Sequence, residues 1–284
     1  MELNLNNITF IIVSFKSEDI IHNCLKSLPS ESKKIVIENS KNINLLREIE
    51  LKYDNIEVVL NENLGMGASN NIGITMSKTD FVYVLNPDTI FKEDTFDKLV
   101  LSLKQINDFA IISPVCSDNN FPNYKIFNNK KFFNNKIIEV DTIDGFSMLI
   151  NKIKFKKNFF DENIFLYLEN DDICLRAKKD NEKLFIIKDA LIDHKGSSST
   201  NIKNNKEFEY LRNWHWMWSK FYFNKKHYGI VNSIIKVCPN LISAIFKFIF
   251  YLITLNSNKK NIYKMRILGL FYSIIGKKSF YRIN

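Results

Sequence analysis

The chain has 284 residues with 45% hydrophobic content, enough to bury a sizeable core, which excludes disorder over most of its length. Lys and Arg outnumber Asp and Glu by 40 to 31, and the formal net charge of +9 favours an anionic partner without identifying it. The four cysteines are scattered, which excludes a disulfide framework and a Cys-rich zinc site. The apolar run at 8–15 is too short for a signal peptide or a membrane span, so we expect the first domain to lie in the cytoplasm.

The sequence up to residue 85 alternates between strand-like and helix-like segments. A continuous β-branched run at 8–14 predicts a strand buried on both faces of a parallel sheet. Further strands are predicted at 34–38, 56–60 and 81–85, and helices at 20–28, 42–53 and 66–77. This alternation favours an α/β fold with a doubly wound sheet, in which ligands bind beyond the carboxyl ends of the strands.

Composition changes near residue 202. Aromatic side chains crowd 207–228, and 230–255 is almost entirely apolar apart from two lysines and a proline. Its longest uncharged apolar stretch falls short of the roughly 20 residues needed to cross a bilayer. We therefore predict a domain at 1–201 and a helical extension at 202–284. The extension's helices lie in a membrane interface or, alternatively, pack their apolar faces on the core.

The first candidate for a functional site is the tripeptide Asn86, Pro87 and Asp88, directly after the strand at 81–85. A carboxylate at the edge of a parallel sheet is a hard oxygen ligand that can hold Mg²⁺ or Mn²⁺ between two phosphates. The alternative is a simple turn, since Asn, Pro and Asp are common turn residues.

Two other segments carry candidate binding residues. The segment 63–73 joins the third strand to a helix, and its small residues and amides let the backbone approach an anionic ligand. Near 194, a second apolar segment ends in His194, which can bind a metal, while Lys195 and the serines at 197–199 can meet phosphate. The alternatives are a capped loop for the first segment and a structural histidine for the second.

Three carboxylates, Glu169, Asp171 and Asp172, gather at the start of an amphipathic helix that follows an aromatic run. In a partly buried space such a carboxylate can have the raised pKa that suits a general base. Arg176, four residues after Asp172, lies on the same helix face and can orient or neutralise it. The alternative is that these acids only cap the helix and interact with its dipole.

In this order, the segments resemble glycosyltransferase family 2, the inverting enzymes of the GT-A fold, and most closely its rhamnosyltransferase-like branch. The resemblance spans about 8–224. The motifs that carry it are Ile12-Val13-Ser14-Phe15 with Glu18, Ile37-Glu38-Asn39-Ser40, Asn63-Leu64-Gly65 through Asn71-Ile72-Gly73, Leu85-Asn86-Pro87-Asp88, Asp144-Gly145-Phe146-Ser147-Met148-Leu149-Ile150, Tyr167-Leu168-Glu169-Asn170-Asp171-Asp172 through Arg176, and His194.

The resemblance implies a Rossmann-like mixed sheet flanked by helices, with a C-terminal helical extension. It also implies a site for a nucleotide sugar made by Ser14, Glu18, Glu38, Asn39, Asn63, Gly65, Asn71, Asn86, Asp88 and Gly145. Asp88 becomes a ligand of Mg²⁺ or Mn²⁺, with His194 as a second ligand or a diphosphate contact. The helix start at 167–176 would supply the base that deprotonates the acceptor hydroxyl.

The sequence departs from the family pattern at three of these positions. Glu38 replaces the usual Asp, and Asn86 replaces the first acid of the metal motif, which permits a weak or dispensable metal. Asn170 stands where the family has its base, and an amide cannot take a proton. Glu169, Asp171 or Asp172 would then act instead, and we favour Glu169 or Asp172.

The resemblance predicts transfer of a sugar, with rhamnose from dTDP-rhamnose as the first candidate, to a lipid-linked or growing surface polysaccharide such as an O-antigen or capsule. The alternatives are a transferase of the same family that uses a UDP-hexose or UDP-N-acetylhexosamine, and a non-catalytic member that binds membranes. The enzyme would lie at the inner face of a bacterial plasma membrane. Nucleic acid is not expected as a partner, because the lysines of the α/β part form no stripe and no nucleic-acid-binding motif occurs.

Overall fold

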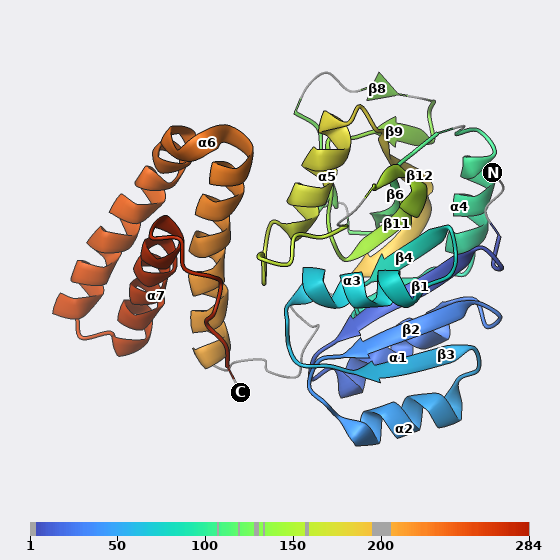
Figure 1. Ribbon diagram of the computed structural model, residues 1–284, viewed down its shortest axis with the longest axis horizontal. Helices are drawn as coiled ribbons and strands as arrows, with labels where there is room; N and C mark the ends of the chain where they lie inside the picture. The colour runs from blue at the N-terminus through green and yellow to red at the C-terminus, as the bar shows by residue number, and fades with distance from the viewer. Residues whose placement is uncertain are drawn as a thin grey trace. The chain divides into compact units, whose positions relative to one another are not determined.

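The computed structural model divides the chain into two compact units, Met1–Asp161 with Asn170–Asn201, and Glu162–Glu169 with Ile202–Asn284. We refer to them as the sheet unit and the helical unit (Figure 1). The described residues are 4–106, 108–118, 120–127, 131–132, 134–156, 159–194 and 206–283. The sequence assigns the segment 162–169 to the first domain, whereas in the structure it packs with the C-terminal helices.

The first half of the sheet unit confirms the predicted alternation of strands and helices. Its elements are β1 (Ile8–Ser14), α1 (Glu18–Ser27), β2 (Lys33–Glu38), α2 (Ile43–Lys52), β3 (Ile56–Leu60), α3 (Met66–Met76) and β4 (Phe81–Leu85). The β-branched runs form the strands, and helices with apolar residues on one face lie between them.

The second half of the sheet unit contains shorter strands and two further α-helices. Its elements are β5 (Thr89–Phe91), α4 (Thr95–Leu103), β6 (Ile111–Cys116), β7 (Tyr124–Lys125), β8 (Lys131–Phe132), β9 (Ile137–Glu139), β10 (Thr142–Ile143), β11 (Ser147–Asn151), the short 3₁₀ helix η1 (Lys152–Lys154), α5 (Glu169–Lys179) and β12 (Leu184–His194). α5 begins at Glu169, the last residue of the helical unit's first segment.

Most of the strands form one mixed sheet in the order β3-β2-β1-β4-β11-β6-β12-β9-β8, with β5 paired to β12. β1 is parallel to β2 and β4, whereas β11 runs antiparallel between β4 and β6. Leu85 at the end of β4 therefore pairs with Ser147 at the start of β11. This register brings the carboxyl ends of β1, β2 and β4 to the loop that precedes β11.

The sheet is buried between two helical layers (Figure 1). One apolar cluster packs α1, α2 and α4 against one face, and a second packs α3 and α5 against the other. α3 lies very close to the sheet at Gly73, where an added Cβ would come within 2.5 Å of Ile11 Cγ2. Glycine is required there because any side chain would push the helix away from β1.

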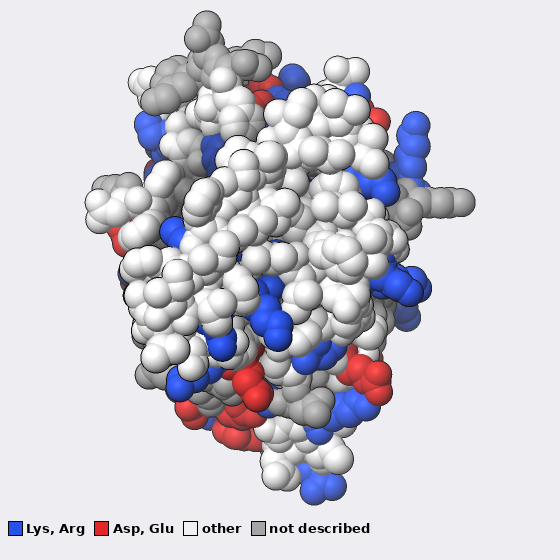
Figure 2. Space-filling model, turned by 90° about the vertical axis from the view of Figure 1, so that its left-hand side faces the viewer, with Lys and Arg blue, Asp and Glu red and all other residues white. Residues whose placement is uncertain are grey.

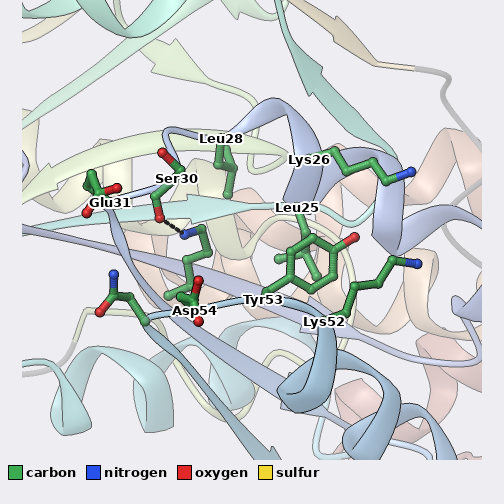
Figure 3. Close-up of a pocket in the computed structure, with 10 residues that line it drawn as sticks. Leu25, Lys26, Leu28, Ser30, Glu31, Lys52, Tyr53 and Asp54 are labelled. Carbon is green, nitrogen blue, oxygen red and sulfur yellow. Dashed lines mark hydrogen bonds between the residues drawn. The ribbon is translucent and has the colours of Figure 1, made fainter.

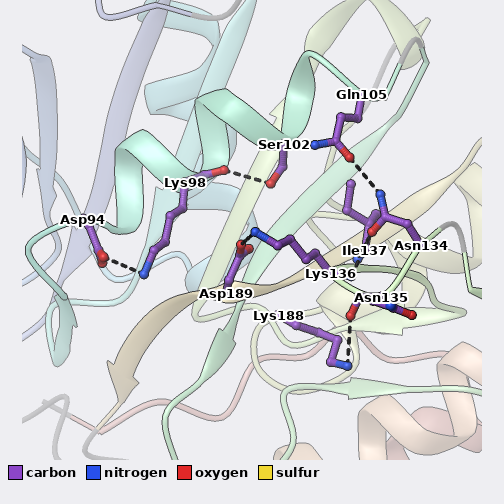
Figure 4. A network of polar contacts seen from close by, with 10 residues as sticks. All are labelled: Asp94, Lys98, Ser102, Gln105, Asn134, Asn135, Lys136, Ile137, Lys188 and Asp189. Carbon is purple, nitrogen blue, oxygen red and sulfur yellow. Dashed lines mark hydrogen bonds and ion pairs between the residues drawn. The ribbon is translucent and has the colours of Figure 1, made fainter.

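The outer strands of the sheet unit are held at their surface by polar contacts (Figure 4). Lys136 Nζ lies 3.1 Å from Asp189 Oδ2, and Lys188 Nζ donates to the carbonyl oxygen of Asn135 at 3.2 Å. Exposed pairs of this kind contribute little to stability individually. Their positions around β9 and β12 indicate a role in bracing the edge of the sheet.

The helical unit contains α6 (Lys206–Ile253) and α7 (Ser257–Ile274). α6 is interrupted at Gly229, whose φ of +83° lies in the left-handed region that favours glycine. The two limbs of α6 then lie side by side (Figure 1), and Lys220 Nζ on the first limb donates to Asn240 Oδ1 on the second at 2.5 Å. The result is a hairpin of helices completed by α7.

The interior of the helical unit is closely packed, and the buried His215 has partners for both of its ring nitrogens. An added Cβ at Gly269 would lie 2.1 Å from the Trp214 carbonyl oxygen, so α7 can pack there only with glycine. His215 Nε2 lies 2.8 Å from the Tyr281 carbonyl oxygen, and its Nδ1 lies 2.8 Å from Ser279 Oγ. A carbonyl oxygen only accepts, so Nε2 carries the proton and Nδ1 accepts from Ser279. Burial lowers the pKa of His215 to about 3.

The surface of the helical unit that faces the viewer in Figure 2 carries few charged side chains, and many of the unit's exposed residues are apolar. They include Ile230, Val231, Ile234, Ile235, Ile242, Ile245, Phe246, Ile249, Phe250, Leu252, Ile253, Phe271, Ile274 and Ile275. We refer to these residues as the apolar face. By length and composition α6 is a candidate membrane span, which the sequence analysis did not expect, although its break at Gly229 makes it two shorter rods.

Candidate active site at the carboxyl ends of the strands

The turn after β4 carries Asp88 into a buried position. The Asn86 backbone N–H donates to the Phe146 carbonyl oxygen at 2.9 Å, which ties the turn to the loop before β11. The Thr89 N–H and hydroxyl both donate to the Asn86 carbonyl oxygen, at 3.2 and 2.7 Å. These bonds close the turn, and Asp88 is buried in it with only 4% of the residue exposed.

His194 meets this turn from the other end of the sheet unit's sequence. It is the last residue of β12, and its register partner on β5 is Thr89. Its Nε2 lies 3.5 Å from Asp88 Oδ1, and its ring stacks on Phe146 with centroids 4.0 Å apart. The structure therefore brings together the two residues that the sequence singled out as metal ligands.

A buried carboxylate beside an imidazole fits a divalent cation of the Mg²⁺ or Mn²⁺ type as a partial ligand set. Within the described ranges, no group of three or more His, Cys, Asp or Glu side chains is arranged to hold a metal. Phosphate oxygens would have to complete the coordination. Cys24 lies close by, with its Sγ 3.6 Å from the Asn86 carbonyl oxygen, but burial raises its pKa to about 12 and keeps the thiol protonated.

The ends of β1 and β2 place Ser14 and Glu38 next to each other in the sheet. Ser14 is completely buried, and its Oγ has no hydrogen-bond partner in the part of the chain that the structure describes. A buried hydroxyl without a partner is costly unless a ligand supplies one. Glu38 differs, because its carboxylate accepts from the backbone N–H of Ser40 at 3.1 Å and of Asn42 at 2.6 Å. Glu38 thus closes the turn after β2.

Asn39 and Asn63 shape the loops beside this turn. The Asn39 amide donates to Ser69 Oγ at 2.8 Å, which links the end of β2 to α3. Asn63 Oδ1 accepts from the Gly65 N–H at 3.3 Å, and Gly65 has a φ of +93° as it leads into α3. On the other side, Glu18 Oε1 accepts from the Asn42 amide at 2.8 Å. These predicted site residues lie just after the carboxyl ends of β1, β2 and β3.

Two neighbouring asparagines on α3 have different surroundings. Asn71 is engaged with the backbone of Phe160, donating to its carbonyl oxygen at 2.9 Å and accepting from its N–H at 3.0 Å. Asn70 is 1% exposed, and neither atom of its amide has a hydrogen-bond partner among the described residues. The sequence motif predicts Asn71 as a site residue, whereas only the structure singles out Asn70. The signal for Asn70 was its position one residue earlier in the same motif.

The start of α5 contains the residues around the family's usual base. The Asn170 amide donates to the Ile143 carbonyl oxygen at 3.1 Å. Asp172 is fully buried, and its Oδ2 accepts from Arg176 Nε at 2.9 Å. Arg176 also donates to the carbonyl oxygen of Phe159. This pairing joins α5 to the loop before it.

The other two acids of this segment have different environments. Asp171 Oδ1 lies 3.6 Å from Lys125 Nζ, close to the protein surface. Glu169 is 6% exposed and belongs to the helical unit. The two residues before it, Tyr167 and Leu168, have φ values of +69° and +70°. Two successive left-handed residues that are not glycine are a strained arrangement, and such strain is concentrated at functional sites.

Asp144 is a half-buried carboxyl group that the sequence analysis did not single out. Burial raises its pKa, and the nearby charge of Asp171 acts in the same direction, whereas Lys125 and His194 oppose the increase. Asp144 precedes Gly145, where an added Cβ would lie 3.2 Å from Asn170 Cβ. Its membership of the motif at 144–150 was the signal that could have identified it. Lys195 and the serines at 197–199 lie outside the described residues.

A separate pocket lies at the opposite edge of the sheet (Figure 3). Lys34, at the start of β2, contributes to its lining, and Lys34 Nζ donates to the carbonyl oxygens of Ser30 and Ser32, both at 2.9 Å. Burial lowers the pKa of Lys34. Because ligands of such sheets bind at the carboxyl ends of the strands, this pocket is not the candidate active site.

Comparison with known proteins identifies the family. The sequence profile of "Glycosyl transferase family 2" matches residues 9–175, which include the β1 to α5 region described above. This chain belongs to glycosyltransferase family 2. The matched region contains Asp88, Asp144 and the acids of α5, whereas His194 and the C-terminal segment 202–284 lie beyond it.

Two curated proteins are similar to this chain in sequence. The "Rhamnosyltransferase WbbL" of Escherichia coli (strain K12) is 30% identical over 198 residues, which cover 58% of this chain and 75% of that protein. The "Low-salt glycan biosynthesis hexosyltransferase Agl10" of Haloferax volcanii is 27% identical over 198 residues, covering 62% of this chain and 63% of its own length. The chain thus spans less than two thirds of the second relative.

Solved structures share the GT-A fold. The mannosyltransferase PcManGT from Pyrobaculum calidifontis, in complex with GDP-Man and Mn²⁺, has a TM-score of 0.57 at 10% identity and covers 96% of this chain and 88% of its own. S. aureus TarS has a TM-score of 0.52 at 14% identity, covering 73% of this chain and 39% of its own. Structures this distant in sequence establish the fold alone. They confirm the predicted mixed sheet flanked by helices.

Proposed function

We propose that this protein is an inverting glycosyltransferase that binds a nucleotide sugar at the carboxyl ends of β1, β2 and β4. The observation that carries the proposal is the pair formed by Asp88 and His194, which lie 3.5 Å apart in the sheet unit. Ser14 and Asn70 support it, since both are buried and offer polar atoms that have no partner in the described chain. A nucleotide sugar carries many hydrogen-bonding groups that can satisfy them.

Asp88 and His194 would hold Mg²⁺ or Mn²⁺, which stabilises the negative charge of the leaving diphosphate. Asn86 offers only an amide at the position of the usual first acid, so the donor's phosphates would supply much of the coordination. We therefore propose a weaker dependence on metal than a site with two carboxylates would have. PcManGT and GalNAc-T7, two proteins of similar fold, have structures with Mn²⁺.

The preferred donor is dTDP-rhamnose, and a UDP-hexose or UDP-N-acetylhexosamine is the alternative. The names of the two curated relatives support a hexose or deoxyhexose, since one is a rhamnosyltransferase and the other a hexosyltransferase. The proposed acceptor is a lipid-linked or growing surface polysaccharide, such as an O-antigen or a capsule.

The helical unit would hold the enzyme against the inner face of the plasma membrane. The apolar face provides a surface that can enter the lipid, and the acids after residue 205 are limited to Glu207 and Glu209. Lys236 lies over the ring of Tyr228, with Nζ 4.1 Å from the ring centroid, and Lys247 lies 5.4 Å from that of Tyr263. Lysine and tyrosine side chains of this kind suit the headgroup region of a bilayer.

A second candidate is a non-catalytic member of the family, and Asn170 favours it. The amide at this position cannot accept a proton, and it donates to the Ile143 carbonyl oxygen. Such a protein would bind a nucleotide sugar and a membrane without transferring the sugar. Turnover of any donor would exclude this candidate.

A thermal-shift screen tests the proposal. The wild-type protein is heated with dTDP-rhamnose, UDP-glucose, UDP-N-acetylglucosamine or GDP-mannose, each with and without Mn²⁺. A ligand that binds only the folded state raises the unfolding temperature, and we expect one of the first three donors to do so more strongly with Mn²⁺. If none of the donors stabilises the protein under either condition, the proposed function is wrong.

A further inference from the structure

We propose that Asp144 is the general base of this enzyme, because the residue at the family's base position, Asn170, cannot accept a proton. The inference rests on the proposed function, because only a transfer to a hydroxyl acceptor needs such a base. It concerns residues of the sheet unit alone, where Asp144, Asn170, Asp88 and His194 are all found.

The first step of the argument is the position of Asp144 beside Asn170. The Asn170 amide donates to the carbonyl oxygen of Ile143, the residue before Asp144, at 3.1 Å. On the other side, an added Cβ at Gly145 would lie 3.2 Å from Asn170 Cβ. Both chain neighbours of Asp144 therefore contact the residue that stands at the family's base position. The Asp144 carboxyl also interacts electrostatically with Asp171, the residue that follows Asn170, and with His194.

The second step concerns the acids of α5. Asp172 is fully buried and bonded to Arg176, so its carboxylate is committed to holding the helix. Asp171 is paired with Lys125. Glu169 is buried, with only 6% of its surface exposed, whereas Asp144 is half-buried and more accessible to an acceptor. These surroundings make Asp144 the better candidate for a base that acts beside Asp88.

The third step is the electrostatic environment of Asp144. Lys125 on β7, Asp171 on α5 and His194 on β12 are the charged or titratable groups that act on it. Partial burial makes its carboxylate a stronger proton acceptor than a fully solvated aspartate, while Lys125 keeps it within reach of the ionised form. Asp144 is only partly buried, which leaves part of it accessible to an acceptor hydroxyl.

The reaction is balanced without any other group. The acceptor's hydroxyl oxygen forms a bond to the anomeric carbon of the donor as its proton passes to Asp144. The bond from the anomeric carbon to the diphosphate oxygen breaks, and its electron pair leaves with the nucleoside diphosphate. Attack from the face opposite the leaving group inverts the configuration of the anomeric carbon.

The test measures release of nucleoside diphosphate from each of the four nucleotide sugars named above, with a lipid extract of the producing cells as acceptor. Asp144→Asn keeps the size of the side chain and removes the proton acceptor, so we expect kcat to fall by about 10²- to 10⁴-fold. The thermal shift caused by the donor should remain. Asp144→Glu should recover part of kcat, and formate should partly rescue Asp144→Ala.

Asp141→Asn is the matched control, since Asp141 lies in the same segment but its Oδ2 accepts from the Phe127 N–H at 2.7 Å. We expect it to keep kcat close to the wild-type value. The assignment is overturned if Asp144→Asn keeps wild-type kcat, if it loses the donor's thermal shift together with kcat, or if Glu169→Gln alone abolishes turnover. A wild-type protein that neither binds nor consumes any donor refutes the proposed function, and the assignment falls with it.

Discussion

The two units of this protein differ in the groups that lack a partner among the described residues: buried polar atoms in the sheet unit and exposed apolar side chains in the helical unit. In the sheet unit, buried polar groups such as Ser14 Oγ and the Asn70 amide have no partner among the described residues, while the apolar core is covered. In the helical unit, the buried His215 is hydrogen-bonded through both ring nitrogens, while the apolar face is open. The sheet unit is thus suited to a small polar ligand inside, and the helical unit to an apolar environment outside.

The largest effect on sugar transfer is expected from a substitution in the sheet unit, at Asp88. Asp88→Ala should lower transfer by at least about 10³-fold, because it removes the only carboxylate of the turn and with it charge stabilisation of the leaving group. The unfolding temperature without ligand should change little. The readout is nucleoside diphosphate release, with Asp118→Ala, at an exposed position, as the control. Unchanged turnover in Asp88→Ala would contradict the site assignment.

If the apolar face binds lipid as proposed, charged substitutions in it should weaken binding to membranes. Replacing Phe246 and Ile249 together by Asp should reduce binding to vesicles of phosphatidylglycerol and phosphatidylcholine by about 10-fold or more, because both side chains are exposed and apolar. Co-sedimentation measures this. Leu51→Asp and Ile153→Asp, at exposed positions of the sheet unit, are the controls and should bind as wild type does. Equal binding by all variants would mean that the apolar face does not contact lipid.

Close packing in the helical unit can be broken at Gly269. Gly269→Val should destabilise the protein by about 3 kcal/mol or more, because its side chain would collide with the Trp214 carbonyl oxygen. Gly229→Ala provides the comparison, since Gly229 has open space around it and only a left-handed backbone. Its expected cost is about 1 kcal/mol. Urea unfolding measures both, and a smaller loss for Gly269→Val than for Gly229→Ala would contradict the packing described.

His215 should make the helical unit sensitive to acid. Its pKa of about 3 in the folded protein lies below its ordinary value of 6.5, so the unfolded chain binds the proton first as the pH falls. Stability should therefore decrease below about pH 6.5, by about 2 kcal/mol at pH 5. Tryptophan fluorescence of urea unfolding at pH 7.5 and pH 5 measures the loss. It should be smaller in His215→Asn, measured in a His22→Gln background because His22 also has a lowered pKa.

The smallest effect is expected at Asn70, one of the buried polar residues of the sheet unit. Asn70→Ala should leave the unfolding temperature nearly unchanged, because no described protein group bonds to the amide it removes. The thermal shift caused by the nucleotide sugar should decrease if the ligand satisfies that amide. An unchanged shift would show that Asn70 does not contact the donor. Asn71→Ala, which breaks two bonds to Phe160, should instead lower stability.

Much of the fold could be predicted from the sequence because the signals for it are local. The β-branched run at 8–14 and the apolar run at 81–85 formed strands as expected, and the mixed sheet followed from their alternation with helices. Asp88 and His194 could be identified because each follows or ends an apolar segment. The strand ends of a sheet converge, so their proximity was implied by the fold.

The rest depended on which side chains meet in space. The pKa of Asp144 is raised mainly by burial, and it is further affected by the charges of Lys125, Asp171 and His194, which lie on three other elements. No pattern of residues around Asp144 predicts that combination. Likewise, the hydrogen bonds that the Glu38 carboxylate accepts from the backbone of Ser40 and Asn42 are visible only in the folded turn.

The break at Gly229 affects the area that the helical unit would present to a bilayer in the proposed membrane contact. An unbroken helix as long as α6, with its 48 residues, would form a rod of about 72 Å at 1.5 Å per residue. Such a rod would touch a membrane along one narrow line. Because α6 folds back at Gly229 and packs with α7, the same residues form a helical bundle that is shorter and wider than a single helix. In the proposed membrane-bound state, this wider bundle would resist rotation about its long axis and would favour one orientation of the helical unit relative to the lipid surface.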